Sequence, residues 1–190
     1  MRVIAGLAKG RRLKTPKGSE LRPTADRVKE ALFNILPHDL SGRRVLDLFA
    51  GTGNLSVEAL SRGAEEAVLV EISREATKLI EENLRALGFT ARSRVLTASV
   101  FKTVRRLARG GESFDLIFLD PPYEQGLVGE TLKEIATEGL LAENGVIVAE
   151  HSVREKVQER YGGYGGLALS DQRRYGDTEL SFFRRGYGDR

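Results

Sequence analysis

Two acids and a tetrapeptide stand where buried strands of this chain are predicted to end. Asp47 opens "DLFAGTGN", Glu71 closes the apolar run "EAVLVE", and Asp120 begins "DPPY" directly after "FDLIFL". A carboxylate at a strand end can accept hydrogen bonds from a ligand, and a glycine turn lets the ligand approach the backbone. Two adjacent prolines fix two φ angles and remove two donors, so the tetrapeptide is stiff and cannot continue a sheet. The three positions therefore indicate a ligand site.

The glycine turn after Asp47 suits a nucleoside cofactor, and its details favour S-adenosyl-L-methionine. The next helix begins with free amide donors, and Glu71 can accept two hydrogen bonds from ribose hydroxyls. The dinucleotide motif G-x-G-x-x-G is incomplete, because Ser56 replaces its third glycine. The charge of Asp47 would repel a pyrophosphate but attract the ammonium of an amino-acid moiety. The residues expected to hold the cofactor at these two strands are Asp47, Phe49, Ala50, Gly51, Thr52, Gly53, Glu71 and Ile72.

The end of a third predicted strand, "TASV", supplies the expected adenine contacts. Proteins that bind this cofactor usually hold the adenine edge there with a polar side chain and a backbone amide. Ser99 and Val100 occupy those places. Many related proteins have Asp where this chain has Ser99, and a hydroxyl accepts a hydrogen bond from the adenine amino group more weakly.

The "DPPY" tetrapeptide is suited to holding an exocyclic amino group of a nucleobase. The carboxylate of Asp120 and the carbonyl of Pro121 can each accept one N–H bond, which aims the nitrogen lone pair at a methyl donor. Pro122 keeps the segment rigid, and Tyr123 offers a flat face on which an extruded base can stack. Asp120 or solvent then takes the released proton. The expected catalytic residues are Asp120, Pro121, Pro122 and Tyr123.

Strand-like and helix-like segments alternate from Gly42 onward, and this alternation sets the fold class. Near-continuous apolar strands separated by amphipathic helices predict an α/β protein with a mostly parallel sheet covered on both faces. The five expected strands are "RRVLDLFAG", "EAVLVEIS", "SRVLTASV", "FDLIFLDPPY" and "GVIVAEHS". The final segment "GLALSDQRRYGDTELSFFRR" has two strand-like runs around a turn, so an antiparallel hairpin completes a seven-stranded sheet of Rossmann-like type.

The N-terminal forty residues are expected to form a separate basic extension. "RVIAGLAKGRRLKTPKG" indicates a small β-hairpin or extended arm, and "PTADRVKEALFNIL" a helix that Thr24 can cap. Residues 1–44 hold eleven Lys or Arg and four acids, a net of +7, whereas the whole chain has +3. This asymmetry favours contact with a polyanion, the alternative being a solvated basic face. We therefore expect an arm and helix at 1–40 and a catalytic domain at 41–190.

Composition excludes several classes of protein. Without cysteine there can be no disulfide, thiolate nucleophile or cysteine metal site. A catalytic zinc site is implausible, because the chain has only two histidines, His38 and His151, besides its carboxylates. Both histidines are interpreted as structural. No apolar run approaches the roughly 20 residues of a membrane span, and the N-terminus lacks the apolar stretch of a secretory signal. The expected location is therefore cytoplasmic.

Four blocks resemble one bacterial family, in the same order and over nearly the whole chain. They are "RVIAG", "LRPTADRVKEALFNIL", "VLDLFAGTGNLSVEALSRGA" and "FLDPPY". The family is that of Rossmann-like class I methyltransferases that modify the N2 amino group of a guanine in 16S (small-subunit) ribosomal RNA. The second block is the specific one, because the other motifs occur across many methyltransferases. Members often carry Phe where this chain has Tyr123, and either ring can stack on a base.

The resemblance implies further roles for the N-terminal residues. Thr24 and Arg27 would cover the cofactor pocket, with Arg27 a candidate partner of the methionine carboxylate. The basic residues of the arm would contact RNA phosphates, the expected partner being 16S rRNA within an assembling small subunit. These residues are Arg2, Lys9, Arg11, Arg12, Lys14 and Arg22. We expect a monomer without metal.

Three alternatives stay open on sequence grounds. A DNA adenine-N6 or cytosine-N4 methyltransferase presents an amino group to the same kind of tetrapeptide, but it generally needs a large target-recognition domain. A non-catalytic ribosome-assembly protein would fit the basic arm but need not keep the acids at all three strand ends. A nicotinamide enzyme is disfavoured by Ser56.

Overall fold

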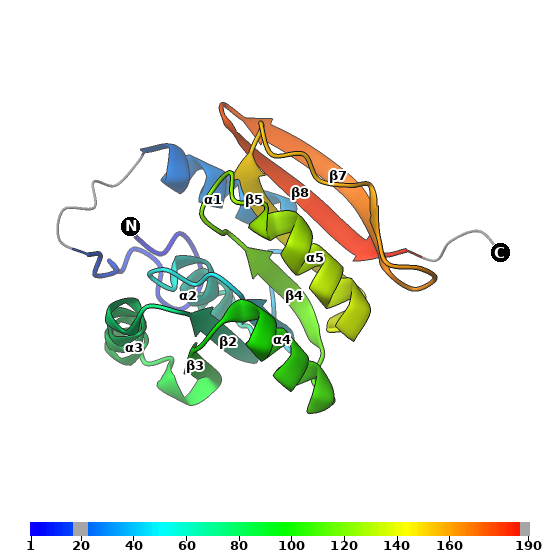
Figure 1. Cartoon of the computed structure of the whole chain (residues 1–190). Coiled ribbons are helices and arrows are strands. Elements are labelled where there is room, and N and C mark those ends of the chain that lie inside the picture. Colours follow the sequence, from blue (N-terminus) through cyan, green and yellow to red (C-terminus); the bar gives the residue numbers. More distant parts are fainter. Residues whose placement is uncertain (17–22, 187–190) are drawn as a thin grey trace. The chain divides into compact units, whose positions relative to one another are not determined.

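The structure is a computed structural model that describes residues 1–16 and 23–186, with the side chains of 23–25 excepted. The chain divides into two compact units, Met1–Ala98 and Ser99–Arg190, and each is described by itself (Figure 1). The expected boundary at residue 40 lies inside the first unit, and the division of roles at that residue stays a prediction. Within the described residues, no helix has the length and apolar character needed to cross a membrane.

Three parallel strands form the sheet of the first unit, in the order β3-β2-β1. The strands are β1 (Arg44–Asp47), β2 (Glu66–Glu71) and β3 (Ser93–Thr97). Their central residues are apolar and buried in β1 and β2, as expected for strands covered on both faces. Because the strands are parallel, the acids that end β1 and β2 lie at the same edge of the sheet.

The helix predicted over "PTADRVKEALFNIL" begins at Pro23, so Thr24 lies inside it and not at its N-cap position. Four helices are described in the first unit. They are α1 (Pro23–Ile35), α2 (Asn54–Ser61), α3 (Arg74–Leu87) and the short 3₁₀ helix η1 (Thr90–Arg92). The hydroxyl of Ser73 accepts a hydrogen bond from the Ala76 amide at the start of α3, and Gly88 ends that helix with a φ of 76°. Glycine adopts this left-handed conformation without steric cost, so the helix can end at Gly88.

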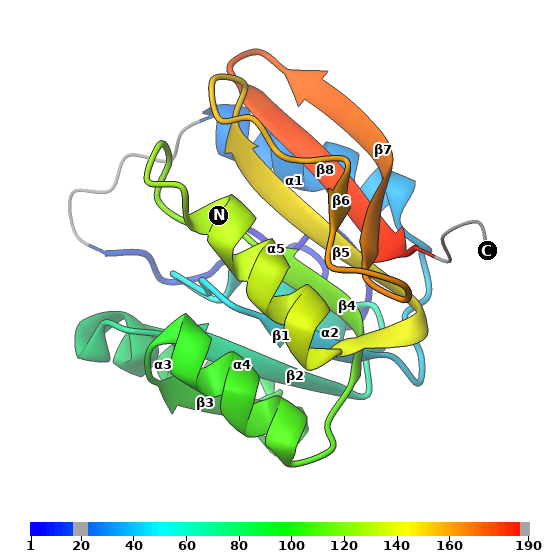
Figure 2. The ribbon, with the colours of Figure 1, turned by 45° about the vertical axis from the view of Figure 1, so that its right-hand side comes forward.

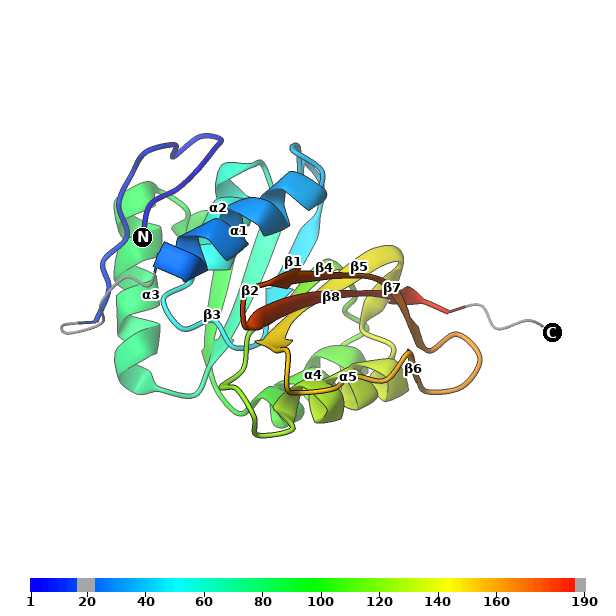
Figure 3. The same cartoon turned by 90° about the horizontal axis from the view of Figure 1, so that it is seen from above.

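The first 16 residues form an arm that runs along α2 and α3 (Figure 3). One antiparallel bridge joins Arg2 to Arg12, and the Val3 amide donates to the Arg11 carbonyl at 2.9 Å. The arm is thus a hairpin-like loop with one bridge and no regular strand in its described part. Val3, Ala8 and Leu13 are buried, so the arm has its own contact with the core.

The second unit contains a mixed sheet and two helices. Its strands are arranged β4-β5-β8-β7-β6, with β4 parallel to β5 and the other pairs antiparallel. The helices α4 (Val100–Arg109) and α5 (Leu127–Glu138) lie side by side (Figure 2). The strands are β4 (Phe114–Leu119), β5 (Leu141–Ser152), β6 (Arg160–Tyr161), β7 (Leu167–Tyr175) and β8 (Thr178–Arg185).

The described residues therefore contain eight strands, where the sequence predicted seven. The additional strand is β6, whose two residues pair with Leu167 and Ala168 of β7. A strand of two residues is too short to show the alternation of apolar and polar residues by which strands are predicted, and here it lies beside the glycine-rich segment 162–166. The C-terminal hairpin, by contrast, is the predicted one, because β7 and β8 flank Gly176 and Asp177.

Candidate functional site

Asp47 ends β1 with its carboxylate buried at 1% exposure. The hydroxyl of Ser56 donates to its Oδ2 at 2.8 Å. Within the described residues, Oδ1 is buried and has no hydrogen-bond partner. A buried carboxylate oxygen without a partner is costly in a folded protein, so it marks a place where a donor can be received.

The environment of Asp47 changes its acidity. Burial raises the pKa of this carboxyl to about 6, against the opposing effect of the Ser56 hydrogen bond. The negative charge of Glu71 adds to the rise. At neutral pH the group is still ionised, and it is a buried anion that a cationic ligand would stabilise.

The glycine turn connects Asp47 to Glu71. The Gly51 amide donates to Glu71 Oε2 at 3.0 Å, and the Ser73 amide donates to Glu71 Oε1 at 2.8 Å. These bonds fix the carboxylate, while each oxygen keeps a second lone pair for a ligand hydroxyl. Gly51 has a φ of 55° and no atom within 4 Å of the place where a Cβ would stand, which leaves room for a ligand beside the turn.

Backbone conformation and close packing both explain why residue 53 is a glycine. It precedes α2 with a φ of 77°, and a Cβ there would lie 3.3 Å from Leu69 Cδ2. The three remaining loop residues predicted to bind the cofactor, Phe49, Ala50 and Thr52, lie between Asp47 and Gly53. The sequence thus brings one contiguous loop to the same edge as Glu71.

For the other predicted cofactor residues, the structure gives their position and exposure. Ile72 follows β2 and is 75% exposed, so an apolar face is available beside Glu71. Arg27 is an exposed residue of α1, and the side chain of Thr24 lies outside the described residues. Ser99 precedes α4 in the second unit and makes no side-chain cap, whereas Val100 is buried.

The tetrapeptide follows β4 in the second unit. Pro121 is buried, and Asp120, Pro122 and Tyr123 are exposed. Tyr123 is 38% exposed and is anchored at the far end of its ring. Its hydroxyl donates to Glu150 Oε1 at 3.0 Å and lies 3.3 Å from Thr178 Oγ1.

The turn after Tyr123 is held in an unusual backbone conformation. Glu124 has a φ of 59°, a region that non-glycine residues rarely adopt. Its amide donates to Glu155 Oε2 at 3.1 Å, and its carboxylate accepts a bond from the Ser152 hydroxyl at 3.4 Å. Contacts with the end of β5 and the segment after it therefore hold the turn in this conformation.

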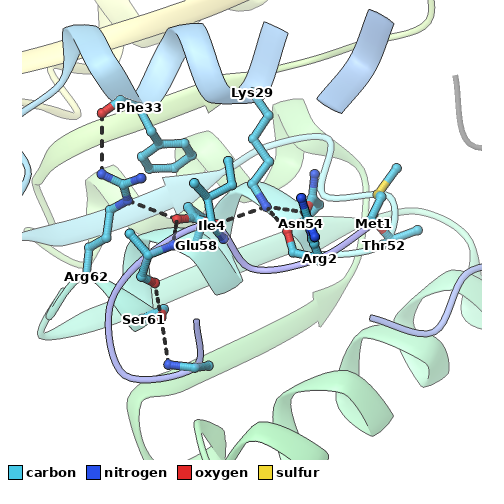
Figure 4. Close-up of polar contacts among 12 residues, drawn as sticks. Met1, Arg2, Ile4, Lys29, Phe33, Thr52, Asn54, Glu58, Ser61 and Arg62 are labelled. Atoms are coloured by element: carbon cyan, nitrogen blue, oxygen red, sulfur yellow. Dashed lines mark hydrogen bonds and ion pairs between the residues drawn. The ribbon is translucent and has the colours of Figure 1, made fainter. Parts of the chain in front are cut away.

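A buried ion cluster fixes the arm to the first unit, and no sequence pattern indicated it. Glu58 of α2, with no exposed surface, accepts hydrogen bonds from the Ile4 and Ala5 amides at 2.8 and 3.0 Å (Figure 4). The same carboxylate pairs with Lys29 Nζ and Arg62 Nε, each at 3.0 Å. We call Lys29, Glu58 and Arg62 the ion cluster.

Lys29 extends the ion cluster from α1 to the arm. Its ammonium donates to the Arg2 carbonyl at 3.0 Å and to Asn54 Oδ1 at 2.7 Å, and the residue is 3% exposed. Ser61 adds a second tie, because its hydroxyl donates to the Ala5 carbonyl at 2.6 Å. A Cβ on Gly6 would stand 1.8 Å from the Ser61 carbonyl oxygen, so only glycine fits there.

The predicted RNA-contacting residues are displayed on this anchored arm. Arg2, Lys9, Arg11, Arg12 and Lys14 are all exposed, and Arg22 lies outside the described residues. Arg11 donates to the Ala86 carbonyl at 2.9 Å, and Lys14 pairs with Glu82 at 2.9 Å. These contacts with α3 set the positions of two cations on the surface.

The histidines are not part of a metal centre in the described residues, where no group of three metal-binding side chains occurs. His151 is fully buried in β5, with Nδ1 3.0 Å from the Ser152 carbonyl and Nε2 2.8 Å from the Ser181 hydroxyl. A carbonyl can only accept, so Nδ1 is the donor in its contact with Ser152. Both ring nitrogens of His151 therefore have partners within the second unit.

The parallel strands, the glycine turn and the strand-end acids define a Rossmann-like methyltransferase. The chain belongs to the family described as "Conserved hypothetical protein 95", whose model matches residues 1–184. YlbH of Bacillus subtilis (strain 168) is 37% identical over 185 residues, 97% of this chain and 99% of the relative.

Two further relatives connect this family to a function and to a solved fold. Ribosomal RNA small subunit methyltransferase D of Escherichia coli (strain K12) is 38% identical over 153 residues, 80% of this chain and 75% of that protein. The solved structure of yhhF from Escherichia coli has a TM-score of 0.82 and 32% identity, and the match covers 99% of each chain. The resemblance seen in the sequence motifs is thereby confirmed.

Proposed function

We propose that this chain is an S-adenosyl-L-methionine-dependent methyltransferase that acts on the N2 amino group of a guanine in 16S ribosomal RNA. The observation that carries the proposal is the buried, partnerless Oδ1 of Asp47 at the end of β1, among the residues that the structure describes. The relative in Escherichia coli, named ribosomal RNA small subunit methyltransferase D, supports the substrate class.

The residues of the first unit fit the cofactor. Asp47 Oδ1 would accept a hydrogen bond from the ammonium of the methionine moiety, which satisfies the buried oxygen. Glu71 would accept bonds from ribose hydroxyls with its remaining lone pairs, and the space beside Gly51 would admit the ligand. When bound, the cofactor supplies a methyl group on a positively charged sulfur.

Further cofactor contacts are assigned on the family resemblance. Ile72 would pack on the adenine face, and Ser99 and Val100 would hold its edge. Arg27 would pair with the methionine carboxylate, with Thr24 beside it.

The tetrapeptide of the second unit would hold the substrate amine. Asp120 and the Pro121 carbonyl would each accept one N–H bond, so that the nitrogen lone pair is directed away from the guanine ring. Pro122 keeps the backbone from rotating, and Tyr123 would stack on the extruded base. Asp120 or solvent would take the proton that the amino group loses on methylation.

The arm would supply affinity for RNA without reading its sequence. Cations on an exposed segment contact phosphates and release bound counterions. The ion cluster holds the backbone of the arm in place, so those cations are presented in a fixed arrangement. An assembling small subunit is the proposed substrate, and a monomer in the cytoplasm the proposed form.

The decisive experiment incubates the protein with labelled cofactor and undermethylated small ribosomal subunits, followed by nucleoside mass spectrometry. We expect N2-methylguanosine from the wild type and none from Asp120→Ala, while calorimetry shows cofactor binding by both proteins. Turnover of Asp120→Ala at the wild-type rate would reject the catalytic role. If a parallel incubation with DNA gave product on adenine or cytosine and the subunits gave none, the DNA methyltransferase would be favoured.

A further inference from the structure

We infer that Glu150 and Thr178 are positioning residues that hold the stacking ring of Tyr123 in place through its hydroxyl. We call these three residues the hydroxyl latch. The inference rests on the proposed function, because it assigns to the ring a substrate base as its partner. It adds two residues, on β5 and β8, to the four of the tetrapeptide.

The strands place the two anchor side chains on one face. In the antiparallel pair of β5 and β8, Glu150 is opposite Leu180 and Ser152 is opposite Thr178. Residues two apart on a strand point to the same side, so Glu150 and Thr178 are diagonal neighbours on one face. The ring of Tyr123 is thus tied to two adjacent strands of the sheet, and not to a loop.

The electrostatic surroundings keep the Tyr123 hydroxyl a hydrogen-bond donor in this tie. Burial and the nearby charge of Glu150 both raise the pKa of Tyr123, so its hydroxyl stays protonated and can donate. Burial likewise raises the pKa of Glu150, and the hydrogen bond from Tyr123 opposes that rise. A hydroxyl that donates to a half-buried carboxylate forms a charge-assisted bond, which is stronger than one between neutral groups.

A phenylalanine would stack on a base equally well, so stacking alone gives no reason for a hydroxyl. The latch gives one, because a ring that is already fixed loses less freedom when the base arrives. The turn that follows is fixed as well, through the Glu124 amide and Glu155. The ring therefore has tethers at its hydroxyl and at the backbone that carries it.

The test measures kcat/KM with undermethylated small subunits, together with the cofactor Kd by calorimetry. We expect Tyr123→Phe to lower kcat/KM by about threefold to tenfold, the scale of ordering one side chain, with the Kd unchanged. Glu150→Ala should cause a similar loss, and Glu150→Gln should restore most of it, because an amide oxygen also accepts. Thr178→Val should have a smaller effect, since its contact is longer.

The matched control is Tyr161→Phe, because the Tyr161 hydroxyl accepts a bond from the Gln158 amide at 3.0 Å in the same unit. We expect that variant to lose thermal stability but to keep its kcat/KM. In the Tyr123→Phe background, Glu150→Ala should add no further loss of kcat/KM. Wild-type kcat/KM in Tyr123→Phe, or full additivity in the double variant, would overturn the latch.

Thermal unfolding separates a failure of the latch from a failure of the proposed function. If the wild type forms no N2-methylguanosine, the proposed function fails, and the latch is then judged on Tm alone. Non-additive Tm shifts for Tyr123→Phe and Glu150→Ala would support the hydroxyl latch whatever the substrate. Additive shifts would overturn it.

Discussion

Two buried acids of the first unit, Glu58 and Asp47, have pKa values that shift in opposite directions. Burial would raise the pKa of Glu58, but hydrogen bonding from the Ile4 amide and pairing with Lys29 lower it below its usual range. For Asp47, burial prevails and the pKa rises to about 6. Glu58 binds two amides and two cations, whereas Asp47 Oδ1 binds nothing in the described residues.

The difference shows how to separate an architectural acid from a binding acid. A buried carboxylate whose partners all come from the protein stabilises a fixed arrangement, here the attachment of the arm to α1 and α2. A buried carboxylate with one partnerless oxygen is completed by something from outside the chain. Strongly perturbed acidity alone would not distinguish them, because structural ion pairs perturb pKa values too.

The largest effect is expected from removing the architectural acid. Glu58→Ala leaves the ammonium of Lys29 and the guanidinium of Arg62 buried without their anion, and we expect a loss of about 3–5 kcal/mol in the free energy of unfolding. Urea denaturation measures it. The control is Glu82→Ala, which removes an exposed pair with Lys14 and should cost far less stability, because solvent screens that pair. Equal losses in the two variants would remove the contrast.

The binding acid should show the reverse pattern. Asp47→Asn removes the charge that would receive the ammonium, and we expect the Kd for S-adenosyl-L-methionine to rise by about tenfold to a hundredfold, as for a charged hydrogen bond. The free energy of unfolding without ligand should not fall, because a costly buried charge is removed. Calorimetry and urea denaturation measure the two quantities. A variant with unchanged affinity but reduced stability would make Asp47 architectural.

The raised pKa of Asp47 gives a pH dependence with a defined sign. The carboxyl is ionised above about pH 6, so cofactor affinity should weaken as the pH falls through 6, by up to about tenfold per unit. The unliganded protein behaves oppositely: this group favours folding most below its unfolded value of 3.8, and that contribution disappears as the pH rises through about 6. Asp47→Asn should flatten both profiles, and a pH-dependent Kd in that variant would assign the titration to another group.

The smallest effect is expected at the surface of the arm. Replacing Arg11, Arg12 and Lys14 by neutral residues should weaken RNA binding and reduce the slope of log K against log salt by about 0.7 for each phosphate that the arm no longer neutralises. Cofactor affinity and stability should change little, because these side chains are exposed. Binding measurements over a range of salt concentrations test this. An unchanged slope would remove the arm from the RNA interface.

Local patterns are sufficient to predict most elements of the fold. The apolar runs that form β1, β2 and β4 are bounded by acids or by proline, and a glycine, Gly88, marks the end of α3. The position of Asp47 before the glycines is likewise readable, because it depends on adjacent residues. The assignments of cofactor, RNA and catalytic residues stay predictions.

Contacts between distant residues are beyond prediction from such patterns. Glu58 lies in a short helix that looks ordinary in sequence, and its partners Ile4 and Ala5 are 54 and 53 residues away. In the sequence, Ser56 is notable only because it replaces the third glycine of the dinucleotide motif. In the structure its hydroxyl donates a hydrogen bond to Asp47, nine residues earlier. The anchors of Tyr123 are 27 and 55 residues distant, on strands whose register no periodicity discloses. In each case the contact depends on the folded arrangement and not on a pattern of neighbouring residues.

The ion cluster has a consequence for behaviour on heating. The hydration of charged groups becomes less favourable as temperature rises, so the cost of keeping Lys29, Glu58 and Arg62 out of water falls. Apolar burial gains nothing comparable in the same range. The arm is therefore attached through ion pairs, whose desolvation cost falls on heating. We expect its contact with α1 and α2 to persist at temperatures where contacts that depend on apolar burial have weakened.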